Sequence, residues 1–234
     1  SELAQALALL GHENAKWDGR RADVLHDVCL LRNAQGRNAD AIKACEQALA
    51  LRETAFGPDS DETAASLDLL GTMHSNAQQF AAGEPLLRRA LAIRERLDPE
   101  GTGAAAVHSN LGALLKEAGR IEEAEPEMLK ALAIFQAKEG AEGSDMPDAL
   151  GSLGGLLAMK GDYAQAEKLK LQAVALSEKL HGRDHDAVAQ QLSGLADLYR
   201  SQGRNPEAEQ LERRALAIRE KLFGADSPMV ATSL

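Results

Sequence analysis

The sequence predicts an all-α solenoid built from antiparallel helix pairs, on three observations. Small residues recur in three columns at steps of 41 or 42 residues, apolar residues recur three and four positions apart, and glycines separate the helical stretches. A fixed period of this length is typical of stacked repeats that share a quasi-one-dimensional core. The columns are Ala48, Ala90, Ala131, Ala173 and Ala215; Ala41, Gly83, Ala124, Ala166 and Ala208; and Cys29, Gly71, Gly112, Gly154 and Ala196.

Each repeat reads as a first helix, helix A, a tight turn and a second helix, helix B. Residues 111–135, LGALLKEAGRIEEAEPEMLKALAIF, show the apolar spacing of helices in both halves, not the alternation of strands. A glycine in the left-handed conformation is expected after helix A, and Asp162 and Asn205 are expected to cap helix B. The turn glycines are Gly36, Gly119, Gly161 and Gly203, and a second loop repeats Gly57, Gly140, Gly182 and Gly224.

The small columns have a physical reason, because Gly or Ala at a helix crossing lets two backbones approach closely. The repeats predict one continuous solenoid over residues 1–234. The expected divisions are 1–21, an N-terminal half-repeat (helix B) and a loop that holds Trp17; repeats at 22–60, 61–101, 102–143, 144–185 and 186–227; and the start of a further helix at 228–234.

Composition excludes several classes of partner. The net charge is −10, which disfavours nucleic acid and an anionic membrane surface as partners. No apolar run approaches the length of about 20 residues that a transmembrane helix needs, and the first residues do not read as a signal peptide. Cys29 and Cys45 fall on apolar helical positions, so we predict reduced, buried thiols and a cytoplasmic protein.

The order of these motifs, with A-E, A-L-x-I and the loop L-F-G-x-D-S-P, resembles the tetratricopeptide repeat (TPR) in its 42-residue, kinesin-light-chain-like form. The resemblance covers about residues 22–224 in five repeats. HEAT and armadillo repeats have similar periods but lack the three small columns. The resemblance implies a right-handed superhelix whose inner surface is lined by helix A and binds an extended peptide.

The resemblance also implies candidate peptide-binding residues on helix A. The asparagine that the family often carries before its L-G pair is retained only at Asn110, and the basic residues with which kinesin light chains hold acidic peptides are absent. The same helix A surface includes Thr72, Ser75, Ala113 and Glu117. The predicted site residues are Asp23, His26, Asn33, Asp68, Asn76, Asn110, Lys116, Asp148, Asp197 and Arg200.

No constellation of catalytic residues stands out, so we predict no enzyme activity, no cofactor and no metal. The loop HGRDHD contains His181 and His185, but it occupies the place of the repeat loop FGPDS, which favours a structural role. His108 stands where sister repeats have leucine and is expected to be a half-buried packing residue.

The leading functional hypothesis is a protein–protein interaction scaffold that binds a peptide or helix of a partner in its concave groove. The first alternative is a regulatory or oligomerisation TPR segment of a larger sensor or effector protein, because repeats are cut at both ends. A metal-dependent enzyme that uses the loop histidines is a remote alternative. The apolar stripes of residues 3–10 and 229–234 also predict end-to-end self-association of the chain.

Overall fold

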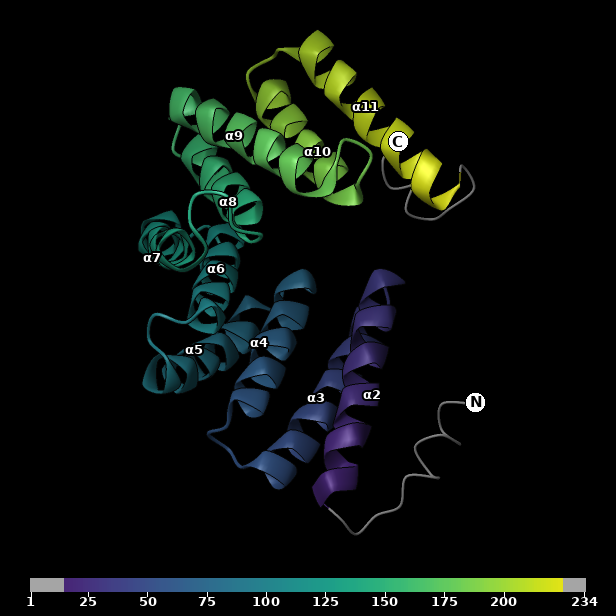
Figure 1. The fold of residues 1–234 in the computed structure, drawn as a ribbon, viewed down its shortest axis with the longest axis vertical. Helices are drawn as coiled ribbons and strands as arrows, with labels where there is room; N and C mark the ends of the chain where they lie inside the picture. Colours follow the sequence, from purple (N-terminus) through teal and green to yellow (C-terminus); the bar gives the residue numbers. More distant parts are fainter. Residues whose placement is uncertain (1–14, 225–234) are drawn as a thin grey trace. The chain divides into compact units, whose positions relative to one another are not determined.

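The computed structural model describes residues 15–224, and these residues form ten helices and no strands (Figure 1). The expected all-α fold is confirmed. The half-repeats expected at residues 3–10 and 229–234, and the end-to-end contact between them, lie outside the described residues. The helices are α2 (Ala15–Ala34), α3 (Asn38–Phe56), α4 (Asp61–Asn76), α5 (Phe80–Leu97), α6 (Thr102–Glu117), α7 (Ile121–Glu139), α8 (Met146–Met159), α9 (Tyr163–His181), α10 (Asp186–Ser201) and α11 (Asn205–Phe223).

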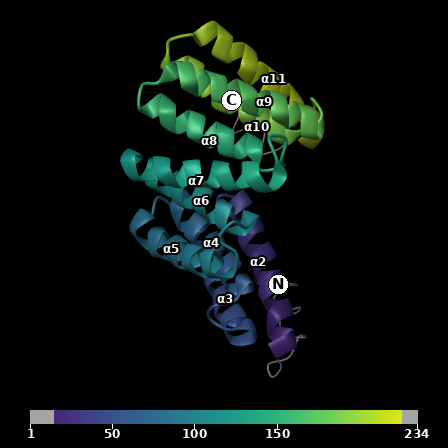
Figure 2. The same ribbon diagram turned by 60° about the vertical axis from the view of Figure 1, so that its left-hand side comes forward.

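The chain divides into two compact parts, residues 1–120 with α2 to α6 and residues 121–234 with α7 to α11. Within each part, helix A packs against its own helix B, and helix B packs against the next helix A. Figure 2 shows this order for α8, α9, α10 and α11. One boundary differs from the prediction, since α2 already begins at Ala15 and places the half-exposed Trp17 in a helix, not in a loop.

Helices A and B cross closely at the small residues, as the columns predict. A Cβ atom added to Gly83 on α5 would lie only 2.8 Å from the carbonyl oxygen of Gly71 on α4. A Cβ atom added to Gly71 would lie 2.7 Å from Cγ of Leu87. A Cβ atom added to Gly154 on α8 would lie 3.2 Å from the carbonyl oxygen of Ala166. Side chains at these positions would force the helices apart, so the small residues set the helix spacing.

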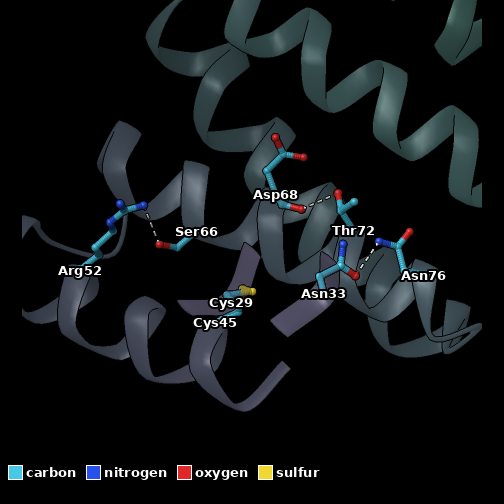
Figure 3. The surroundings of a disulfide bond; sticks show 8 residues. All are labelled: Cys29, Asn33, Cys45, Arg52, Ser66, Asp68, Thr72 and Asn76. Atoms are coloured by element: carbon cyan, nitrogen blue, oxygen red, sulfur yellow. Dashed lines mark hydrogen bonds between the residues drawn. A yellow bond between two sulfur atoms is a disulfide. The ribbon is translucent and has the colours of Figure 1, made fainter. Parts of the chain in front are cut away.

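The prediction of two reduced thiols is wrong, because Cys29 on α2 and Cys45 on α3 form a disulfide bond (Figure 3). Both residues are buried, and their Cα atoms are 5.5 Å apart. The repeat explains the pairing. Cys29 and Cys45 are 16 residues apart, as are Gly71 and Leu87, which touch across the same crossing in the next repeat. The disulfide therefore replaces a packing contact at the crossing of helices A and B.

A column of arginines on helix B contacts the helices A beside it in three repeats. Arg52 on α3 donates hydrogen bonds to Asp23 of α2 at 3.0 Å and to Ser66 of α4 at 3.1 Å, and Figure 3 shows the second bond. Arg94, 42 residues later, donates to the backbone oxygen of Gly103 at 2.8 Å. Arg219 on α11 is the third member of this column. In the sequence, the columns of small residues gave no indication of this column of arginines.

The turn chemistry is confirmed with one exception. All eight predicted turn and loop glycines have positive φ angles, between 70° and 92°. The side chain of Asp162 accepts a hydrogen bond from the backbone N–H of Gln165 at 3.2 Å and caps α9, as predicted. Asn205 does not cap α11, because Arg204 occupies the N-cap position and Asn205 is already the first helical residue.

We expect the disulfide to stabilise the first repeat. Replacing both cysteines (Cys29→Ala with Cys45→Ala) should lower the free energy of unfolding by about 3 kcal/mol, because a cross-link across a loop of this length restricts the unfolded chain. Urea unfolding of the oxidised protein and the variant measures the loss, and peptide mapping without reductant identifies the bond.

A second variant separates the cross-link from packing. Cys29→Gly with Cys45→Leu installs the residues of the Gly71–Leu87 contact and should recover part of the loss. Equal stability of the oxidised protein and the double-alanine variant would contradict a stabilising disulfide.

Candidate functional site

All ten predicted site residues lie on first helices of the repeats, as the resemblance implied. Seven are in the part formed by residues 1–120 and three in the part formed by residues 121–234. Their use in peptide binding stays a prediction. By helix, they are Asp23, His26 and Asn33 on α2; Asp68 and Asn76 on α4; Asn110 and Lys116 on α6; Asp148 on α8; and Asp197 and Arg200 on α10.

Four of these residues pair with one another between successive helices A. The amide of Asn76 donates a hydrogen bond to the amide oxygen of Asn33 at 3.2 Å, which is visible in Figure 3. The amide of Asn110 donates to a carboxylate oxygen of Asp68 at 2.8 Å. Each bond joins side chains 42 or 43 positions apart in the sequence. The repeat thus brings polar side chains of neighbouring helices A together as an inter-helix ladder.

A similar hydrogen bond joins two successive helices A within residues 121–234. Asp148 on α8 accepts a hydrogen bond from the side-chain amide of Gln191 on α10 at 2.6 Å. Asp197 pairs with Arg200 at 2.6 Å, and Arg200 reaches Glu212 of α11 at 3.3 Å. These charges are therefore partly neutralised within the chain.

The two remaining predicted residues of α2 lie beside Arg52. Asp23 pairs with Arg52 at 3.0 Å. His26 is half-buried, and its Nδ1 atom has no hydrogen-bond partner within residues 15–224. Burial, followed by the charge of Arg52, lowers the pKa of His26, which keeps the imidazole neutral near pH 7. This environment suits packing better than contact with a charged ligand.

A pocket of about 540 Å³ opens between α4 and α6 and is bordered by the turn that leads into α5. Six of its lining residues belong to the helix A surface that the resemblance marked. Two others, Gln78 and Phe80, were missed because they lie on or after the turn. The lining residues are Thr72, Ser75, Asn76, Gln78, Phe80, Asn110, Ala113 and Glu117.

Gln78 departs from the repeat in a way that bears on this pocket. It occupies the place of Gly36, Gly119, Gly161 and Gly203, and its φ angle is 58°. Gln78 is the non-glycine residue with positive φ within residues 15–224. Backbone strain of this kind persists where the surrounding structure enforces it and often marks a functional position. The broken glycine column was the sequence signal that could have identified Gln78.

Asp68 accepts the hydrogen bond from Asn110 and is largely buried. Burial raises the pKa of its carboxyl group above the usual range, and the hydrogen bond from Asn110 and the charge of Arg94 offset this only in part. Thr72 also donates a hydrogen bond to the backbone oxygen of Asp68 at 2.9 Å (Figure 3). Asp68 therefore orients two of the residues that line the pocket.

His108, His181 and His185 make contacts that are typical of structural side chains. The ring centroids of His181 and His185 lie 4.7 Å apart, and Nδ1 of His185 accepts the backbone N–H of Ala187 at 3.2 Å to cap α10. Among residues 15–224, no group of three or more His, Cys, Asp or Glu side chains is placed to hold a metal ion. His108 is almost fully buried, not half-buried as expected, and its Nε2 atom lies 3.5 Å from Glu95.

Three overlapping or successive segments match the family model of the tetratricopeptide repeat, at residues 20–96, 71–137 and 145–221. No curated protein matches the chain. Within the described helices, none is long and apolar enough to cross a membrane.

Several crystal structures share the fold. A Podosopora anserina protein described as a kinesin light chain with nearly identical TPR-like repeats is 22% identical, with a TM-score of 0.63 over 87% of this chain and 97% of that one. BtubC (BKLC) from P. vanneervenii is 21% identical, with a TM-score of 0.71 over 94% of this chain and 88% of that one. A Rap protein in complex with competence and sporulation factor is 17% identical, with a TM-score of 0.74 over 94% and 64%.

The strain at Gln78 predicts a gain in stability on its removal. Gln78→Gly should raise the free energy of unfolding by about 1 kcal/mol, because glycine adopts positive φ without the steric cost of a Cβ atom. Gly161→Gln is the reverse change in a sister turn, where an added Cβ atom meets no neighbour, and should lower stability by a similar amount. Urea unfolding measures both, and a loss of stability in Gln78→Gly would refute the strain.

The raised pKa of Asp68 predicts a pH-dependent effect. As pH rises above about 4, an ordinary aspartate in the unfolded chain ionises first, so Asp68 contributes progressively less stability until its own, higher pKa is passed. Asp68→Asn does not titrate. The free energy of unfolding of this variant, relative to the wild type, should therefore increase as pH rises across that window.

Unfolding in urea at a series of pH values from 4 to 8 tests this expectation. Asp59→Asn, on the exposed loop before α4, is the matched control. A difference between Asp68→Asn and the wild type that stays constant with pH would contradict it.

Proposed function

We propose a function for this chain, which belongs to the tetratricopeptide repeat family, as the family matches show. The chain is a protein-interaction module, without catalysis of its own, that binds an extended segment of a partner protein on the helix A surface. The observation that carries this proposal is the pocket between α4 and α6, lined mainly by polar residues of two successive helices A.

The pocket offers the groups that an extended peptide requires. The amides of Asn76 and Asn110 and the hydroxyl groups of Thr72 and Ser75 can exchange hydrogen bonds with main-chain N–H and C=O groups. Phe80 adds an aromatic surface for a side chain. The complex of a Rap protein with competence and sporulation factor gives a precedent for ligand binding by a protein of this fold.

The predicted site residues take different parts in this proposal. Asn76 and Asn110 contact the peptide, while Asn33 and Asp68 position their amides from the neighbouring helices. Lys116 is not a lining residue, but it pairs with the lining residue Glu117 at 3.0 Å. Asp23 pairs with Arg52, and His26 is a packing residue beside it. Within residues 121–234, Asp148, Asp197 and Arg200 are candidate peptide contacts of that part by itself.

A pocket-filling substitution tests the proposal. Peptides are first selected from a phage-displayed dodecapeptide library against the whole chain, and their affinity is measured by fluorescence anisotropy. Ala113→Phe places a large ring in the pocket and should weaken binding of the selected peptides at least about tenfold, because a filled pocket loses the contacts of its ligand.

Ala92→Phe makes the same change at an exposed position of α5 and should leave affinity unchanged. Circular dichroism confirms that both variants fold. If Ala92→Phe abolishes binding and Ala113→Phe does not, the partner binds elsewhere and the assignment to helix A is wrong.

A further inference from the structure

We propose that the pocket between α4 and α6 binds a basic side chain, arginine or lysine, of the partner peptide, and that Gln78 determines this preference. The inference rests on the proposed function and adds the chemistry of the ligand. It follows from three features of the lining residues: which hydrogen-bonding groups are already used, which charges are present, and which residue is kept at a strained turn.

The pocket is rich in hydrogen-bond acceptors, because three of its polar side chains direct a donor into the protein. Thr72 donates its hydroxyl hydrogen to the backbone oxygen of Asp68 at 2.9 Å. Asn76 donates to Asn33 at 3.2 Å, and Asn110 donates to Asp68 at 2.8 Å. Figure 3 shows the bonds of Thr72 and Asn76. Each amide keeps its second N–H, while the hydroxyl oxygen and both amide oxygens remain able to accept hydrogen bonds from a ligand.

The charge and the aromatic surface of the pocket fit the same ligand. Glu117 contributes a carboxylate that is 60% exposed, and the eight lining residues include no Lys, Arg or His. Lys116, whose side chain is 21% exposed, pairs with one carboxylate oxygen of Glu117 at 3.0 Å from outside the lining set, and the other carboxylate oxygen can accept a hydrogen bond from a ligand. A cation near Phe80 would also gain from the face of its ring.

The net charge of the whole chain also favours a cationic partner. Its net charge of −10 attracts basic segments over a distance of about one Debye length, roughly 8–10 Å in physiological salt. An ammonium or guanidinium group offers only donors, three or five of them, and so matches a pocket that offers mainly acceptors. An acidic side chain would instead meet Glu117 and unsatisfied acceptors.

Gln78 is the lining residue that departs from the repeat pattern. Its exposed side chain borders the pocket, although the other four repeats have glycine at this turn and its φ of 58° is unfavourable for glutamine. Packing does not explain the residue, because the side chain is exposed. Its amide oxygen adds one more acceptor at the rim, which gives the strained conformation a role in ligand recognition.

The peptides selected against the whole chain provide the test. They should be enriched in arginine or lysine relative to the library. Replacing the basic residue of a selected peptide by its neutral analogue, citrulline or acetyl-lysine, should weaken binding about tenfold. Glu117→Gln should weaken the basic peptide about three- to tenfold and leave the affinity of the neutral analogue unchanged. Glu100→Gln, in the exposed loop before α6, is the matched control and should have no effect.

Gln78→Gly separates recognition from folding. It should weaken the basic peptide about threefold while the melting temperature rises by about 2–4 °C. Unchanged affinity in Gln78→Gly would refute the role of Gln78. Selected peptides that lose affinity in Ala113→Phe but carry no basic residue would overturn this inference and leave the proposed function intact. Selected peptides that are insensitive to Ala113→Phe would overturn both.

Discussion

The close crossing of helix A over helix B is the constraint on which the other features of each repeat depend. Where Gly83 meets the backbone of Gly71, no side chain separates the two helices, so a small residue is required at the crossing. The first repeat meets the same requirement with a covalent bond between Cys29 and Cys45. The period of 41 or 42 residues repeats this crossing and, within each of the two parts, brings helices A together, as in the pairs α4 and α6 and α8 and α10.

This arrangement decides how the polar residues of helix A are used. Side chains that a single helix would offer to solvent lie within reach of the next helix A, and they form hydrogen bonds such as Asn76 to Asn33 and Asn110 to Asp68. The bonds fix the rotamers of the amides and direct some of their donors into the protein. The surface left for a ligand is therefore more selective than its composition suggests, because it presents mainly acceptors.

One repeat differs from the others at the position where the pocket opens. The turn after α4 holds Gln78 in a conformation that glycine adopts in the four sister turns. Proteins commonly retain local strain at positions that serve recognition. The stability that Gln78→Gly is expected to gain and the affinity that it is expected to lose are two consequences of the same side chain.

The sequence by itself determined the helix pairs, the small residues at the crossings and the helices that carry the polar surface, because period and residue size are properties of the chain read in one dimension. It also marked Asn110, Asn76 and most residues of the pocket through a family resemblance. Only the tertiary structure decided which side chains pair. Cys29 meets Cys45, and Asp68 meets Asn110, because two helices bring them together at distances that spacing along a single helix does not specify. The contribution of Gln78 and Phe80 was hidden for the same reason, since they border the pocket from a turn outside helix A.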